Sequence, residues 1–312
     1  MIGVKAPDVD TRDDFGGGCI KRTLLVSNQG KANPMFPKTL FTVTGSEQPA
    51  DAVARAIEMS RENACHLAVL VIGIALPASA TAYGAVPADT WSEEREKGRA
   101  AATQKASEIE ALLKEAEVSG DVATYYCDEG QIADIVGMRA RYTDLGLVLP
   151  SPDQDTRLTN KTLEGFVYQS ARPFLFVPGN TMATLKPKRV LIGWNSTREA
   201  ASAVHDAMDL LGAADTVHVA VVDPVAGEFD QGEEPGSDIA AYLARHGVRV
   251  TVDVLASGGR SAADALLQHA TDIDADVIVA GAYGHSRLRE FLFGGATRDL
   301  LANEAFPVLM AH

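Results

Sequence analysis

The stretch Asp276-Val-Ile-Val-Ala-Gly281-Ala-Tyr-Gly284 decides how this chain is expected to fold. Its apolar, β-branched run suits a strand that is buried on both faces, in a parallel sheet between two layers of helices. The glycines at its end let the backbone turn sharply and approach a ligand closely. Gly294 and Gly295 then precede a predicted helix, Thr297 to Asn303, whose first N–H groups can receive an anion. Strand, glycine turn and helix start together predict a phosphate-binding loop.

The spacing of these glycines is specific. Gly281, Gly284 and Gly294 form the pattern Gly-x2-Gly-x9-Gly, which resembles the nucleotide-binding fingerprint of the universal stress protein family. In relatives that bind ATP, a Ser or Thr usually follows the third glycine, and a second hydroxyl two positions later also meets the phosphates. Here these positions hold Gly295 and Thr297. The resemblance therefore implies that ATP or another adenine nucleotide binds, with one of the two hydroxyl contacts missing.

The resemblance also implies contacts to the nucleoside. In nucleotide-binding relatives an Asp after the first strand contacts the nucleoside, and a Val at the end of the second strand lines the adenine pocket. The matching positions are Asn195 and, within one residue, Val221. The amide of Asn195 can hydrogen-bond a ribose hydroxyl or a base, or it can equally serve the N-cap region of the next predicted helix, Thr197 to Leu211. His285 is placed to reach phosphates or a partner, although a loop of solvated charges explains it as well.

The same order of strands and helices occurs twice along the chain. Residues 35–180 and 187–312 each predict five strands that alternate with helices, after an extension, residues 1–34, that we expect to be poorly ordered. The predicted fold class is α/β, with two tandem doubly wound five-stranded parallel-sheet domains of the Rossmann-like or flavodoxin-like type. In matching the copies we align Leu40 with Leu191 and Leu145 with Asp276.

The copies differ after their fourth strands. The first copy continues as Pro150-Ser-Pro-Asp-Gln-Asp-Thr156, with no glycine pair. Prolines remove N–H donors, and aspartates repel phosphate. We therefore predict that the first copy is a structural repeat without a phosphate site.

The charge and hydropathy of the chain limit the kinds of partner that it is expected to bind. The net charge is −14, which disfavours nucleic acid and anionic membrane surfaces. No apolar run approaches the ~18 residues of a membrane span, and the N-terminus lacks the apolar core of a signal peptide, so a cytoplasmic location is predicted.

Short motifs of catalysis and metal binding are missing from the sequence. It has no G-x4-G-K-[ST], no G-x-S-x-G and no H-x3-H or C-x2-C spacing. Cys19, Cys65 and Cys127 are best explained as buried or idle thiols. We predict no catalytic residues, no metal site and no enzymatic activity.

The sequence thus favours a stress-response protein that binds an adenine nucleotide in its second copy and acts as a sensor or regulatory module on an unknown protein partner. The alternatives are an interaction protein of the same fold without nucleotide, and a slow ATPase. The last strands of the two copies, Pro173 to Val177 and Phe306 to Met310, are short, apolar edge strands. Single-domain members of the family commonly pair through their last strands, so the resemblance implies that these two strands pair antiparallel within one chain as an intramolecular pseudo-dimer. Pro307 is expected at the start of its strand or with its missing N–H facing outward. A further homodimer is allowed but not required.

Overall fold

The structure is a computed structural model, and it describes residues 20–24, 37–75, 80–81, 84–85, 88–150, 156–179, 181–224, 234–282 and 295–312. The C-terminal half, from residue 187, contributes five parallel strands in the order β11-β10-β9-β12-β13. These strands are β9 (Arg189–Gly193), β10 (Thr216–Val222), β11 (Val250–Leu255), β12 (Val277–Gly281) and β13 (Val308–Ala311).

The N-terminal half repeats this arrangement with five parallel strands in the order β6-β3-β2-β7-β8. They are β2 (Thr39–Gly45), β3 (His66–Ile74), β6 (Gly120–Cys127), β7 (Leu145–Val148) and β8 (Phe174–Phe176). Counted within each half, the order is 3-2-1-4-5, as in the first five strands of the Rossmann order. The predicted fold class is confirmed.

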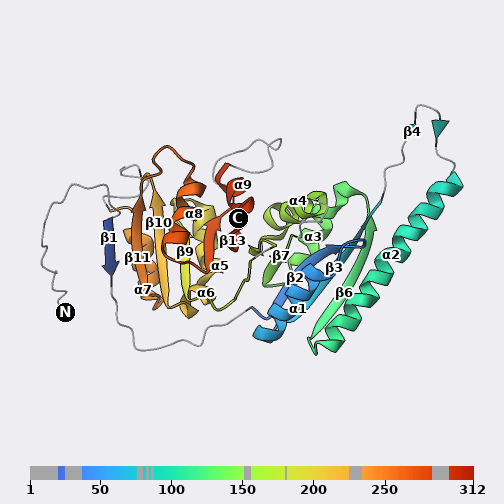
Figure 1. Cartoon of the computed structure of the whole chain (residues 1–312), viewed down its shortest axis with the longest axis horizontal. Coiled ribbons are helices and arrows are strands. Elements are labelled where there is room, and N and C mark those ends of the chain that lie inside the picture. The colour runs from blue at the N-terminus through green and yellow to red at the C-terminus, as the bar shows by residue number, and fades with distance from the viewer. Residues whose placement is uncertain are drawn as a thin grey trace, which may run out of the picture.

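The two halves meet through their last strands, as predicted. β8 pairs antiparallel with β13, and Phe174 lies opposite Met310 and Phe176 opposite Val308. Pro307 immediately precedes β13, and its carbonyl accepts a hydrogen bond of 3.0 Å from the Ile278 N–H. The pairing joins both halves into one sheet of eleven strands, which runs from β1 at one end to β6 at the other (Figure 1).

Helices cover both faces of this sheet. One face carries α1 (Asp51–Asn63), α2 (Ala88–Glu115), α5 (Arg198–Asp206), α6 (Met208–Ala213) and α7 (Ser237–Arg245). The other carries α3 (Ile132–Ala140), α4 (Thr156–Gly165), a π-helical turn η2 (Phe166–Ser170), α8 (Ala262–Asp272) and α9 (Gly295–Leu301). A 3-10 turn η1 (Glu129–Gln131) and a small hairpin of β4 (Ala80–Thr81) and β5 (Gly84–Ala85) complete the described elements. The apolar core on each face contains residues of both halves, so the two halves pack as one body.

Two elements differ from the sequence prediction. The helix expected over Thr197 to Leu211 is divided at Ala207, where φ is −89° and ψ is 0°, into α5 and α6. In the extension that was expected to be poorly ordered, Ile20–Leu24 forms strand β1, which pairs antiparallel with β11. An unpaired edge strand presents a row of free N–H and C=O groups, and β1 satisfies those of β11.

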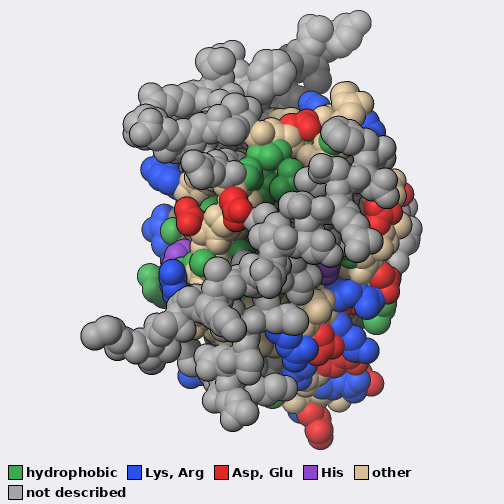
Figure 2. All heavy atoms as spheres, turned by 90° about the vertical axis from the view of Figure 1, so that its left-hand side faces the viewer, with side chains coloured by type: hydrophobic (Ala, Val, Ile, Leu, Met, Phe, Trp, Pro, Cys, Tyr) green, Lys and Arg blue, Asp and Glu red, His purple; other side chains and the backbone are tan. Residues whose placement is uncertain are grey.

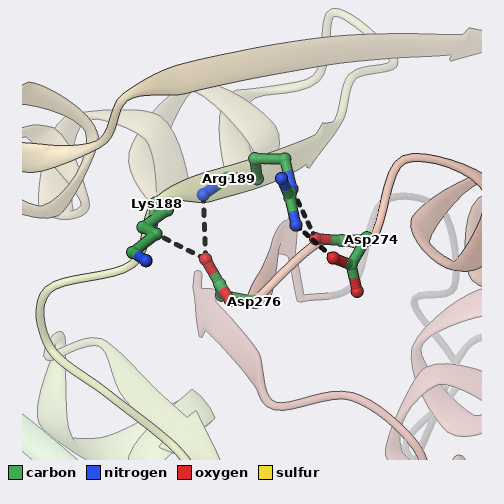
Figure 3. Close-up of polar contacts among 4 residues, drawn as sticks. All are labelled: Lys188, Arg189, Asp274 and Asp276. Carbon is green, nitrogen blue, oxygen red and sulfur yellow. Dashed lines mark hydrogen bonds and ion pairs between the residues drawn. The ribbon is translucent and has the colours of Figure 1, made fainter.

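An aspartate joins the amino ends of the first and fourth strands in the C-terminal half (Figure 3). The Asp276 carboxylate accepts hydrogen bonds from the backbone N–H groups of Lys188, at 2.7 Å, and Arg189, at 2.9 Å. The Arg189 guanidinium in turn bonds the Asp274 carbonyl, at 2.7 Å, and pairs with the Asp274 carboxylate. We call the Asp276 contact an aspartate clamp.

The N-terminal half has the same clamp, because the Asp144 carboxylate accepts from the N–H groups of Lys38 and Thr39, both at 2.9 Å. Asp144 therefore corresponds to Asp276, and the residue after it, Leu145, corresponds to Val277. The alignment of Leu145 with Asp276 was wrong by one residue, as was that of Leu40 with Leu191. In a strand, such a shift turns a side chain to the opposite face of the sheet.

Among the described residues, every helix is too short or too polar to serve as a membrane-spanning segment.

Candidate functional site

The candidate site lies where strand order reverses in the C-terminal half. β9 and β12 are neighbours, with Gly193 opposite Ala280, although they are the first and fourth strands of that half. Parallel strands on either side of such a switch point leave a crevice at their carboxyl ends. Asn195 follows β9 and Gly281 ends β12, so the structure brings these two predicted site residues to the same edge of the sheet.

Asn195 shapes the turn into α5. Its side-chain oxygen accepts hydrogen bonds from the Thr197 hydroxyl, at 2.8 Å, and from the Thr197 N–H, at 3.3 Å. Thr197 is the N-cap of α5 and accepts in turn from the Ala200 N–H at 3.3 Å. Between them, Ser196 has a φ of 59°. Asn195 therefore supports the N-cap region of α5 through its side-chain oxygen, as one of the two alternatives held. Its amide nitrogen still carries two hydrogens that can be donated to a ligand.

Gly281 is required by packing. A Cβ on this residue would stand 2.5 Å from the Ala200 nitrogen and 2.6 Å from the Glu199 carbonyl carbon. Both atoms belong to the backbone of α5, so no side-chain rotation could relieve the clash. The glycine thus lets the start of α5 approach the end of β12, and that approach closes one side of the crevice.

The remaining residues of the predicted glycine loop divide into two groups. Gly295 begins α9, and no described atom beyond its chain neighbours lies within 4 Å of where its Cβ would stand. Thr297 is buried in the same helix, with 5% of its surface exposed. Gly284, His285 and Gly294 lie outside the described residues.

The end of β10 contributes a buried residue and an exposed one. Val221 is enclosed in the apolar core on the α7 side of the sheet, with 1% of its surface exposed. Asp223, just beyond the strand, has a φ of 42° and accepts a hydrogen bond of 3.0 Å from the Ser257 N–H. The hydroxyl and backbone N–H of Ser257 hold the pKa of Asp223 below its ordinary value, so its carboxylate stays charged at neutral pH.

Sequence reasoning did not assign Asp223 or Ser257 to the site. The signal that could have found them is their position, since polar residues directly after buried parallel strands gather at one edge of the sheet. Ser196 and Asp223 are also the described non-glycine residues with positive φ that follow strands; the others follow helices. Such backbone conformations concentrate at ligand sites.

The end of the molecule that carries β1 and β11 has side chains of both charges on its surface. Figure 2 looks at the end that carries β1 and β11, where acidic and basic side chains lie interleaved over the lower part of the described surface. The net charge of −14 is therefore not gathered into one acidic patch on this face.

The N-terminal half has a hollow at its own carboxyl edge. A cleft of about 780 Å³ opens beside the residues that follow β2 and β3. Its charged lining consists of four carboxylates and two cations, namely Glu47, Glu94, Asp128, Glu129, Lys97 and Arg157. The excess of carboxylates disfavours a phosphate, in keeping with the prediction for this half, although residues 151–155 lie outside the described part of the chain.

The fold is that of a doubly wound α/β protein whose strand order reverses between β9 and β12. Residues 186–312 match the model of the Universal stress protein family. The C-terminal half of the chain therefore matches the family that the glycine pattern indicated.

Solved structures extend the fold to both halves. The chain is similar to a universal stress protein from Archaeoglobus fulgidus DSM 4304, with 16% identity and a TM-score of 0.60 over 87% of this chain and 95% of that one. It is also similar to a functionally unknown protein from Pseudomonas aeruginosa PAO1, with 18% identity and a TM-score of 0.51 over 88% and 92% of the two chains. No curated protein sequence matches the chain.

Proposed function

We propose that this protein binds an adenine nucleotide, ATP or a relative of it, at the carboxyl edge of its C-terminal half, and acts as a non-catalytic sensor or regulatory module in a stress response. The observation that carries the proposal is the adjacency of β9 and β12, which brings Asn195 and the start of the glycine loop to one crevice in the half that matches the family. The N-terminal half serves in this proposal as a structural partner.

Backbone donors and the Asn195 amide would supply the contacts. The amide hydrogens of Asn195 suit a ribose hydroxyl or a base, and the backbone N–H groups around Gly295 suit a phosphate oxygen. No described side chain or loop lies within 4 Å of where a Gly295 Cβ would stand, which leaves room for such an approach. The hydroxyl that relatives carry at this position would add ~1.5–3 kcal/mol of binding energy, so binding here is expected to be roughly ten- to a hundredfold weaker.

The acidic character of the chain does not prevent this. At physiological ionic strength, charges more than about 8 Å apart are largely screened, so the nucleotide responds mainly to its immediate contacts. Those contacts are backbone N–H groups, whose donors do not depend on net charge.

An interaction protein without nucleotide is the second candidate function. The packing of Gly281 against α5 and the hydrogen bonds of Asn195 to Thr197 both serve the fold itself, and neither needs a ligand. A slow ATPase is the third candidate function. We assign no residue as its general base among the described residues of the crevice.

Titration of the full-length chain with ATP by calorimetry, after mass spectrometry of any small molecule that co-purifies, tests the proposal. Asn195→Ala should weaken binding about tenfold, because it removes one hydrogen-bonding side chain from a polar ligand. Lys97→Glu, in the cleft of the N-terminal half, is the matched control and should leave binding unchanged. No binding by the folded chain would favour the interaction protein, and a loss confined to Lys97→Glu would move the site to the other half.

A further inference from the structure

A buried cluster of two histidines and one carboxylate lies between the sheet and α8. His218 is on β10, Asp253 on β11 and His269 on α8. His218 Nδ1 lies 2.7 Å from Asp253 Oδ2, and His269 Nε2 lies 2.9 Å from the same oxygen. One nitrogen or oxygen atom from each residue falls within 4.8 Å of the other two.

Strand register and helix placement assemble the cluster. His218 and Asp253 point to the same face of the sheet, because His218 lies opposite Thr251, two residues before Asp253. That face is covered by α8, whose buried side includes Ala263, Leu266 and His269. Since all three ligands come from strands and a helix rather than from loops, their positions are held by the fold.

The burial of this cluster is unusual for its chemistry. Asp253 has none of its surface exposed, and the His269 side chain is 8% exposed. The His218 side chain is 16% exposed and so opens the cluster on one side. A fully buried carboxylate is costly unless both of its oxygens are compensated.

The two carboxylate oxygens of Asp253 have different hydrogen-bonding partners. Both histidines approach Oδ2, while Oδ1 is buried without a hydrogen-bond partner among the described residues. One oxygen of this fully buried carboxylate is therefore left unpaired among the described residues.

A purely structural hydrogen-bond network would leave this oxygen unexplained, because buried polar groups are nearly always satisfied. A cation at the centre of the cluster would compensate the carboxylate, and its bonds could be shared between the two oxygens. The imidazole rings lie at 72° to one another with centroids 6.2 Å apart, so their nitrogens converge from different directions.

We propose that His218, Asp253 and His269 form a binding site for a divalent transition-metal ion of the zinc class. Nδ1 of His218, the Asp253 carboxylate and Nε2 of His269 are the protein ligands, and a water molecule on the exposed side of His218 completes the coordination. Two imidazoles with one carboxylate are a common ligand set of open zinc and non-haem iron sites. Nitrogen donors argue against Mg²⁺ and Ca²⁺, which prefer oxygen ligands.

The distances fit with a small adjustment. In a tetrahedral site with bonds of about 2.1 Å, the ligand atoms are about 3.4 Å apart. The separations of 2.7 and 2.9 Å therefore need to widen by about 0.7 and 0.5 Å, respectively. The His218 side chain, which is the most exposed of the three, has the most room to move in this adjustment.

The test uses the full-length chain, freed of metal with a chelator and then loaded with Zn²⁺ or Co²⁺. One zinc per chain should remain after desalting, the melting temperature should rise with zinc, and Co²⁺ should give the visible absorption of a low-coordinate site. His218→Gln and His269→Gln should each weaken zinc binding by about a hundredfold or more, because removing an outer-shell partner alone costs ten- to a hundredfold. Glutamine retains a donor toward Asp253, which favours folding of both variants.

His66→Gln is the matched control. His66 also pairs with an aspartate, Asp121, at 2.8 Å, but this pair is exposed and has no second histidine. Its loss should leave zinc stoichiometry unchanged. No zinc retained by the folded wild-type chain, or zinc lost in His66→Gln and kept in the other variants, would overturn the site.

X-ray absorption of the zinc-loaded wild-type chain gives a readout that does not depend on how the variants fold. Two imidazole ligands with only oxygen besides are expected. A sulfur ligand would place the zinc on a cysteine and overturn the assignment.

Discussion

The two halves of the sheet share their amino edge and differ at their carboxyl edge. At the amino edge, Asp144 and Asp276 make the same pair of backbone hydrogen bonds in their respective halves. At the carboxyl edge, the C-terminal half has the turn at Asn195 and the close packing of Gly281 against α5, whereas the N-terminal half has a cleft whose charged lining is mainly carboxylates. The repeat is thus retained where contacts hold the strands together, and it has diverged where a ligand would bind.

The two halves also differ on the face of the sheet that α3 and α8 cover. In the N-terminal half it is filled by Phe41, Phe166 and Phe174, with ring centroids 5.9 and 5.6 Å apart. Strand register places Ala68 and Ala123 of that half at the positions of His218 and Asp253. One copy of the fold therefore keeps an apolar layer where the other carries two buried ionisable groups, so the polar cluster is not required by the fold.

The largest expected effect is that of Gly281→Ala, which tests whether this glycine serves packing. Its Cβ would meet the α5 backbone at 2.5 Å, so we expect the free energy of unfolding to fall by about 3 kcal/mol. Urea denaturation of the full-length chain measures the change. Gly295→Ala, where the space is open, is the control and should change stability by less than about 0.5 kcal/mol. Equal stability of the two variants would contradict the packing explanation.

The clamps should contribute equally in the two halves. Asp144→Ala and Asp276→Ala each remove an anionic acceptor of two backbone N–H groups, which should cost about 2 kcal/mol. Because the clamps share no partner, the double variant should lose the sum. Asp→Asn at the same positions keeps the shape without the charge and should fall between. If one substitution lowered the free energy of unfolding strongly and the other did not, the two clamps would share their geometry but not their contribution to stability.

Gly295→Ser should sharpen the difference at the carboxyl edge. It restores the hydroxyl that nucleotide-binding relatives carry, in a place where the side chain meets no described atom. If the proposed function holds, ATP should bind about tenfold more tightly, which corresponds to about 1.4 kcal/mol. Calorimetry measures the affinity, and Gly212→Ser, an equally open position in α6, is the control. Unchanged affinity would remove Gly295 from the site.

The smallest effect concerns the thiols of the N-terminal half. Cys65 and Cys127 are free and buried, and burial raises the pKa of both thiols, with nearby Asp144 and Asp128 adding to the shift. Since the thiolate is the reactive form, both should react slowly with iodoacetamide at pH 7.5 in the folded chain and rapidly in urea. Peptide mapping follows each site separately. Fast labelling of Cys65 in the folded chain would show that the N-terminal core opens readily.

The sequence by itself determined the fold class, the tandem repeat and the pairing of the last strands. The fold class and the repeat follow from local patterns, because buried strands are apolar β-branched runs and the glycine spacing is specific. The pairing of the last strands was implied by the resemblance to a family whose single-domain members pair there, together with the need of an apolar edge strand for a partner. The position of the switch point depends on the strand order, which the structure supplies. Matching the copies residue by residue was less secure, since an apolar strand looks alike when it is shifted by one position, and the aspartate clamps were needed to set the register.

Only the tertiary structure decided what the individual site residues do. Gly281 looked like part of a phosphate loop, but its clash partners are backbone atoms of α5, about eighty residues earlier in the chain. Asn195 left two explanations open until its contacts with Thr197 were seen. The cluster of His218, Asp253 and His269 has no sequence signature at all, because its members are 35 and 16 residues apart on two strands and a helix. Strand register and helix packing bring such residues together, and neither can be predicted from the spacing of residues in a short motif.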